Sequence, residues 1–239
     1  MILDDYLKNS SLIKWFKKYK KYLFIILIYI LYQTNFLLAI LDGFGIKLNE
    51  LSKGIRISAF ALSDFTYVLV LLIMFKSEIK KGLKDLKENF SDNMIISLKC
   101  WILGLVVMMV SSLIINAILK QNVSNNEALV RESIKLAPIY MLYTCSIIAP
   151  ILEEMVFRRA IRGLIKWDIP FIILSGLSFG YLHVIGSYNS ALDFLYIIPY
   201  GSMGSAFAYL LTKTKNITLP IMIHMIHNTI LVLVRIIGG

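Results

Sequence analysis

Two adjacent carboxylates and an arginine stand in an apolar stretch of the C-terminal half, within the sequence ILEEMVFRRAIRG. Glu154 and Arg158 are four residues apart, so on a helix they share a face and can form an ion pair. Glu153 points about 100° away from Glu154, which leaves its carboxylate available for chemistry. The alternative is that these charges mark the solvated end of a cytoplasmic helix.

Further polar side chains follow in two later apolar stretches. Phe179 and His183 lie one helical turn apart, after Gly176 and Gly180, whose GxxxG spacing allows close approach of another helix. His224 and Asn228 share a helix face, with the neighbouring His227 one step off it. Each set has a structural alternative, namely a packing role for His183 and an interhelical polar contact for His224 and Asn228.

Together these residue types suit the hydrolysis of an amide bond. A carboxylate near a histidine can take a proton from water, while a second histidine and an asparagine present donors to a developing oxyanion. Zinc-assisted hydrolysis competes, with His183, His224 and a glutamate as ligands. The chain has no HExxH motif, and Cys100 and Cys145 lack metal-ligand spacing, so the prediction is a site with no metal and no cofactor.

The elements that carry these residues are membrane spans. The chain is 58% hydrophobic and only 17% charged, with a mean hydropathy of +0.72, too apolar for a soluble protein. A span needs about 20 apolar residues, and the stretches that qualify are 22–41, 57–75, 94–119, 136–165, 169–185, 192–211 and 217–237. We predict an all-α polytopic bundle of about seven transmembrane helices, within a range of six to eight.

Charge predicts the orientation and the divisions of the chain. If the N-terminus is cytoplasmic, 18 of the 25 Lys and Arg residues fall on the cytoplasmic side, as the positive-inside rule requires. Residues 1–21 are then a basic amphipathic lead facing membrane lipids, 22–133 are N-terminal membrane helices with a charged cytoplasmic segment at about 76–93, and 134–239 are the catalytic membrane domain. The basic residues are spread over loops, so nucleic-acid binding is excluded.

Helical rise predicts that the polar sets meet. A hairpin turning at about 166–170 would place Glu153 and His183 each roughly 13 residues from the turn, hence about 20 Å from it at one depth. The last span starts from the same side, which brings His224 and Asn228 to about 10 to 17 Å. The sequence therefore predicts one polar site inside the membrane.

The motifs EExxxR, FxxxH and HxxxN, in this order over about residues 134–235, resemble those of the CPBP family of intramembrane glutamate proteases, the CAAX proteases and bacteriocin-processing enzymes of Abi type. The resemblance implies that Glu153 and His183 activate water and that His224 and Asn228 form the oxyanion site. Glu154, Arg158 and Phe179 would support the site, and His227 is an accessory that the family pattern does not require. The family is an all-helical bundle, often of eight spans.

We therefore expect a membrane endopeptidase of a bacterial cell membrane, because richness in Ile, Lys and Asn favours a bacterial member. It would cut a CAAX-like, leader or signalling peptide or a lipidated, membrane-associated protein near the cytoplasmic side, in bacteriocin maturation or self-immunity. The alternatives are a non-catalytic membrane immunity or partner-binding protein and a proton or ion carrier. The oligomeric state is not predicted.

Overall fold

The computed structural model describes residues 11–238, and all regular elements of this part are helical. Six segments are long and apolar enough to cross a membrane: Lys53–Met74, Phe90–Leu119, Pro138–Leu164, Asp168–Ile185, Ala191–Thr214 and Thr218–Gly238. A bent pair of helices near the N-terminus raises the number to seven if it counts as one span. The predicted all-α membrane bundle is confirmed, with boundaries that differ from the expected ones by a few residues.

The bent pair replaces the single straight span predicted at 22–41. Helix α2 (Ser11–Gln33) and helix α3 (Phe36–Gly43) meet at an angle of 57°. Asn35 between them has φ 50° and ψ 37°, a left-handed conformation that Asn adopts more readily than most residues. The predicted basic lead falls partly on residues 1–10, which lie outside the described residues, and the rest of it begins α2.

The charged segment predicted at 76–93 is a helix, α5 (Lys76–Glu88), between α4 (Lys53–Met74) and α6 (Phe90–Leu119). The side chain of Asn216 fastens it to the distant turn before the last helix. Asn216 Nδ2 donates to the Gly82 carbonyl at 2.9 Å and to Asp85 Oδ2 at 2.8 Å. Hydrogen bonds from Asn216, Asn89 and Asn93 hold the pKa of Asp85 below its usual range.

The fourth predicted span is one helix of mixed geometry. The α-helical parts are α8 (Pro138–Tyr143), α9 (Ala149–Glu153) and α10 (Ile161–Leu164), and two π-helical turns separate them, η2 (Thr144–Ile148) and η3 (Glu154–Ala160). Pro150 explains the first π turn, because it has no N–H to give to a carbonyl four or five residues earlier. π turns inside α-helices are frequent at functional sites.

The remaining elements are α7 (Asn125–Leu136), α11 (Asp168–Ile185), the 3₁₀ turn η4 (Ala191–Tyr196), α12 (Ile197–Thr214) and α13 (Thr218–Gly238). Gly176 and Gly180 face α12, as their spacing predicts. A Cβ on Gly180 would lie 2.5 Å from the Ile197 carbonyl oxygen, so only glycine permits this contact.

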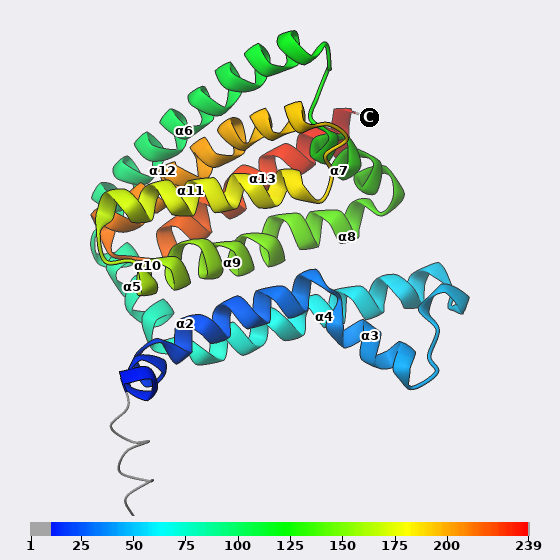
Figure 1. Ribbon diagram of the computed structural model, residues 1–239, viewed down its shortest axis with the longest axis horizontal. Helices are drawn as coiled ribbons and strands as arrows, with labels where there is room; N and C mark the ends of the chain where they lie inside the picture. Colours follow the sequence, from blue (N-terminus) through cyan, green and yellow to red (C-terminus); the bar gives the residue numbers. More distant parts are fainter. Residues whose placement is uncertain (1–10, 239) are drawn as a thin grey trace, which may run out of the picture.

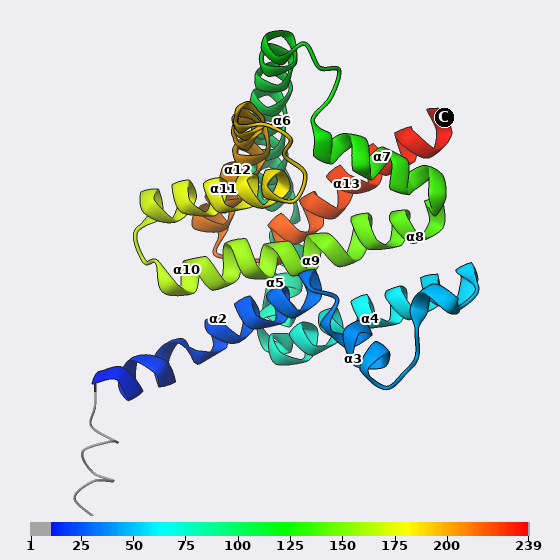
Figure 2. The ribbon, with the colours of Figure 1, turned by 45° about the vertical axis from the view of Figure 1, so that its right-hand side comes forward.

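The helices form layers around α8–α10 (Figure 1). Helices α2 and α4 cover one side of it, α11 and α13 pack on the other, and α12 lies between α11 and α6 (Figures 1 and 2). α10 and α11 join in the predicted antiparallel hairpin, with α5 at the same end of the bundle. Helix α7 and the C-terminal end of α13 lie at the opposite end.

Candidate active site

A cavity of about 570 Å³ lies between α6, α7, α9, α11, α12 and α13, and the four residues predicted to do chemistry line it, namely Glu153, His183, His224 and Asn228. Phe179 and His227 line it as well. Glu154 and Arg158 lie behind the wall, each with 0% exposure. The structure thus brings the three sequence motifs together, although they come from separate helices.

Glu154 is the centre of a buried charged cluster. Its Oε2 lies 2.9 Å from Arg158 Nε, which is the predicted ion pair, and its Oε1 lies 2.8 Å from His224 Nδ1. The Arg158 guanidinium also stacks over the rings of Phe179 at 4.6 Å and Phe207 at 5.6 Å. Each charge has an ion-pair partner, which lowers the cost of burying it, while Arg158 Nη1 and Nη2 make no hydrogen bond within the described residues.

His224 therefore has a fixed orientation. A carboxylate accepts hydrogen bonds, so Nδ1 carries the proton that it shares with Glu154, and Nε2 is directed to the other side of the ring. Glu153 Oε2 lies 3.7 Å from this Nε2. Glu153 forms no ion pair with His183 in the described part of the chain, so its nearest imidazole is that of His224, whereas the family resemblance implied a partnership with His183.

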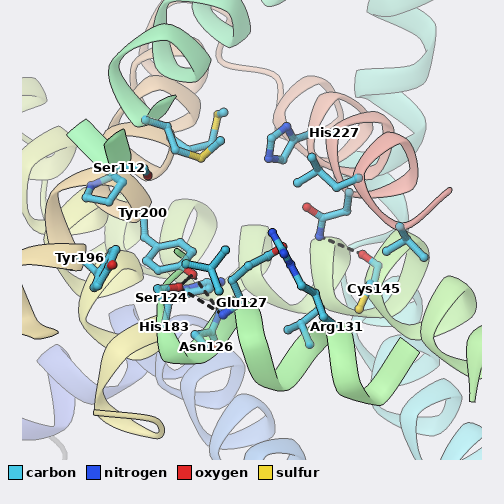
Figure 3. A pocket seen from close by; sticks show the side chains of 18 of the residues that line it. Ser112, Ser124, Asn126, Glu127, Arg131, Cys145, His183, Tyr196, Tyr200 and His227 are labelled. Atoms are coloured by element: carbon cyan, nitrogen blue, oxygen red, sulfur yellow. Dashed lines mark hydrogen bonds and ion pairs between the residues drawn. The ribbon is translucent and has the colours of Figure 1, made fainter. Parts of the chain in front are cut away.

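His183 presents one nitrogen to the cavity. Its Nδ1 lies 2.9 Å from the Phe179 carbonyl oxygen, which can only accept, so Nδ1 is the protonated nitrogen of the neutral ring. The ring stacks on Tyr200 with centroids 4.8 Å apart and on Phe179 at 4.4 Å. These contacts use Nδ1 and leave Nε2 as a hydrogen-bond acceptor or a base; Figure 3 labels His183 near Tyr200.

Asn228 has a structural contact. Its Nδ2 donates to the Cys145 carbonyl at 2.9 Å. In a π-helix this carbonyl would accept from the N–H five residues later, but that residue is Pro150, which has no N–H. The interhelical polar contact that the sequence left open is therefore present. The carboxamide still has a second N–H and an acceptor oxygen.

His227 is held by a residue of α6. Trp101 Nε1 donates to His227 Nδ1 at 3.2 Å, so the neutral ring carries its proton on Nε2. The residue is 6% exposed and lines the cavity, where this N–H is a potential donor to a ligand.

Sequence reasoning missed the part of the wall that α7 supplies, because 120–135 was treated as a loop. Ser124 Oγ and Tyr200 Oη are 2.7 Å apart, and Asn126 Nδ2 donates to the same Tyr200 oxygen at 3.2 Å, as Figure 3 shows. A signal was available, because Ser124 caps the helix by accepting from the N–H of Glu127, which is the start pattern S-x-x-E.

Metal ligation was the competing chemistry. Among residues 11–238, no group of three His, Cys, Asp or Glu side chains is arranged so that it could hold a metal ion. His183 was a ligand only in this alternative, and its Nδ1 is directed to a backbone carbonyl.

Comparison with known families shows which proteins this arrangement is similar to. The profile of the family described as type II CAAX prenyl endopeptidase Rce1-like matches residues 135–230, which contain every residue of the three motifs. We refer to the residues that match this family, 135–230, as the Rce1-like domain. The Rce1-like domain therefore includes α8 to α12 and most of α13, and α7 precedes it.

Two bacterial relatives extend the similarity beyond the Rce1-like domain. The protein named "Putative membrane peptidase YdiL" of Bacillus subtilis is 28% identical over 231 residues, 91% of this chain and 90% of that protein. The "Membrane-embedded CAAX protease MroQ" of Staphylococcus aureus is 29% identical over 211 residues, 81% of this chain and 78% of that protein. No solved structure gave a significant match. The Rce1-like domain supports membrane endopeptidase activity.

Proposed function

We propose that this protein is an intramembrane endopeptidase of the bacterial cell membrane that hydrolyses a peptide bond with water activated by Glu153. The observation that carries the proposal is the position of the Glu153 carboxylate, which lines the cavity 3.7 Å from a histidine that Glu154 holds in place. A glutamate that faces a cavity beside an oriented imidazole is the arrangement that general acid–base catalysis needs.

Glu153 is proposed as the base. Its carboxylate takes a proton from water while the water oxygen forms a bond to the carbonyl carbon, and the carbonyl electron pair moves to the oxygen. Collapse of this intermediate breaks the C–N bond, and the proton on Glu153 passes to the leaving nitrogen. His183 Nε2 is an acceptor that can hold the water in position.

The donors to the oxyanion come from α13. Glu154 holds the Nδ1 side of His224, so Nε2, on the side of Glu153, is the nitrogen that can present an N–H to the oxyanion when it carries a proton. Asn228 contributes the N–H that Cys145 does not use. His227 Nε2–H is a third donor, which the sequence resemblance did not require.

The substrate is proposed to be a CAAX-like, leader or signalling peptide or a lipidated, membrane-associated protein, and bacteriocin maturation or self-immunity is the proposed context. With the N-terminus cytoplasmic, as the charge count predicts, the α7 end of the bundle faces away from the cytoplasm. The cavity reaches that end, where Glu127, Arg131 and Arg235 line it. We therefore propose access from that side, in place of the cytoplasmic side expected from sequence.

The test compares wild type with Glu153→Gln, which removes the charge and keeps the shape. Peptide processing is measured in cells at matched protein abundance, and we expect a loss of about 10²-fold or more. Glu50→Gln, at an exposed position, is the control and should process normally. Full processing by Glu153→Gln refutes the proposal, and loss of wild-type activity with a zinc chelator would assign the water activation to a metal.

The second candidate is a non-catalytic membrane immunity or partner-binding protein. It is favoured by the structural contacts that Asn228 and Glu154 make, since these are polar contacts between helices of a kind common in membrane bundles. On this hypothesis the phenotype of Glu153→Gln follows protein abundance alone.

A further inference from the structure

A second hollow lies on a face of α12 other than the one that lines the candidate active site. Helices α6 and α11 both pack on α12, which lies between them (Figures 1 and 2). A groove of about 750 Å³ is formed by these three helices. Among residues 11–238, none that lines the groove also lines the cavity that holds Glu153. The groove is therefore separate from the candidate active site.

The middle of the groove is apolar. Leu103 and Val107 of α6 and Ala206 of α12 line it. Ser202 and Ser205 line it as well, but each serine hydroxyl donates to a backbone carbonyl of the protein, at 2.7 and 3.5 Å. The serines therefore do not need a hydrogen bond from a ligand, and this part of the groove suits a hydrocarbon chain.

Two lysines lie toward the end of the groove that is near α5. Lys99 on α6 and Lys213 on α12 both line the groove, and both are exposed. The Lys213 ammonium lies 5.2 Å from the centre of the Tyr209 ring, which also lines the groove, so a cation–π contact holds this cation there. Asp92 is the acidic residue of the lining. With two cations and one anion, the groove carries a net positive charge.

The groove has the depth of one lipid leaflet. On α6 Val107 lies eight residues beyond Lys99, and on α12 Ser202 lies eleven residues before Lys213. These intervals are about 12 and 16 Å at 1.5 Å per residue. The hydrocarbon core of a bilayer is about 30 Å thick, so one leaflet contributes about 15 Å. Cations followed by an apolar channel of this length match the charged headgroup and the acyl chain of a phospholipid.

We propose that the groove binds one anionic phospholipid, with its phosphate held by Lys99 and Lys213 and one acyl chain lying along α12. With the N-terminus cytoplasmic, as the charge count predicts, the headgroup faces the cytoplasm, where the leaflet carries anionic lipid. The net positive charge of the groove favours an anionic lipid over a zwitterionic one. The Asp92 carboxylate can accept hydrogen bonds from the hydroxyls of a glycerol headgroup, so the lipid is phosphatidylglycerol. This inference does not depend on the proposed peptidase activity.

The experiment uses the full chain, purified in a non-ionic detergent and titrated with one lipid at a time. The lipids are phosphatidylglycerol, phosphatidylethanolamine and phosphatidylcholine with identical acyl chains. Native mass spectrometry gives the number of lipids bound and their affinities. We expect one phosphatidylglycerol to bind about tenfold more tightly than either zwitterionic lipid, the size of one charge-assisted hydrogen bond. The temperature of unfolding should rise with phosphatidylglycerol, because the bound lipid contacts both α6 and α12 in the folded state.

Variants of the two lysines test the headgroup site. Lys99→Gln/Lys213→Gln should bind the three lipids with equal affinity, and Lys99→Arg/Lys213→Arg, which keeps both charges, should retain the preference for phosphatidylglycerol. The matched control is Lys80→Gln/Lys84→Gln, which removes two exposed charges from α5 at the same end of the bundle. It should retain the tenfold preference, because general attraction to a basic surface is not what selects the lipid.

A variant at the deep end of the groove tests the position of the acyl chain. Val107 is 42% exposed, so Val107→Trp places a larger ring in the groove without filling the core. It should weaken the binding of all three lipids by a similar factor and leave the preference for phosphatidylglycerol intact. Ile114→Trp, at an exposed position of the same helix outside the groove, is the control and should bind lipid as the wild type does.

Three results would overturn the proposal. Equal affinities of the wild-type protein for the three lipids would mean that the lysines select nothing. A preference that survives in Lys99→Gln/Lys213→Gln but is lost in Lys80→Gln/Lys84→Gln would assign the selection to the surface of α5. Unchanged binding by Val107→Trp would mean that the acyl chain does not lie in the groove.

Discussion

Replacing Glu154 by Gln should destabilise the protein far more than replacing any exposed glutamate. Glu154 and Arg158 are both fully buried, with Oε2 and Nε 2.9 Å apart. With an effective dielectric constant of about 20, two unit charges at this distance attract each other by roughly 6 kcal/mol. Breaking one partner of a buried pair costs about 3 to 5 kcal/mol, because the other charge stays buried alone, and we expect this loss for Glu154→Gln.

The measurement is unfolding by a denaturing detergent in micelles, followed by the reaction of the two free cysteines with a thiol dye. Cys100 is buried, so it reacts only when the bundle opens. Glu78→Gln is the matched control, since Glu78 also pairs with an arginine, Arg159, at 2.5 Å but is 38% exposed. Its expected cost is at most about 1 kcal/mol.

A second variant tests the reason for the loss. Glu154→Gln/Arg158→Met removes both charges and fills the space with an apolar side chain, so most of the lost stability should return. The reasoning is refuted if Glu154→Gln costs no more than Glu78→Gln, or if the double variant is no more stable than Glu154→Gln alone.

Three further outcomes are expected. Gly180→Ala should lower the free energy of unfolding by about 1 to 3 kcal/mol, because the new Cβ would meet the Ile197 carbonyl. Gly54→Ala, which has open space around it, should leave this free energy unchanged. Thermal unfolding of the two variants tests the difference. Trp101→Phe should lower kcat about two- to tenfold, because it removes the hydrogen bond that holds His227. Trp167→Phe, at an exposed position, is the control. An unchanged kcat in Trp101→Phe contradicts the role of His227 as a donor. The lowered pKa of Asp85 stabilises the folded state above the pKa of about 3.9 that Asp has in the unfolded chain. The advantage of wild type over Asp85→Asn in free energy of unfolding should therefore shrink as pH falls below about 4. An advantage that does not change with pH contradicts this prediction.

The helical architecture could be predicted because the thickness of the bilayer sets the length of the apolar segments that span it. Each apolar stretch of sufficient length is helical, the first of them as the bent pair α2 and α3, and the hairpin between α10 and α11 turns where a short polar break occurs. The bend at Asn35 could not be predicted, since Asn is also tolerated within spans and only the packing of α3 selects the left-handed conformation. Helix α7 was missed because its composition is too polar for a span-length search.

The spacing of the motifs predicted which residues line the candidate site, but it did not predict which of them contact each other. The Glu154–Arg158 ion pair is local in sequence, so helical geometry predicts it. The contacts of Glu154 with His224 and of Asn228 with Cys145 join residues 70 and 83 positions apart, and no periodicity carries that information. The resemblance paired Glu153 with His183, whereas the structure places Glu153 beside His224.

The two π-helical turns have a consequence for insertions and deletions. Each π turn contains one residue more than an α turn of the same helix, so deleting one residue from η2 would restore α geometry and leave the later residues facing their original directions. The same deletion in α8 or α9 would rotate everything on one side of it by about 100° relative to the other. Chimeras between this chain and its relatives should therefore tolerate the loss of one residue within Thr144–Ile148, and fail when the loss falls between that turn and Glu153.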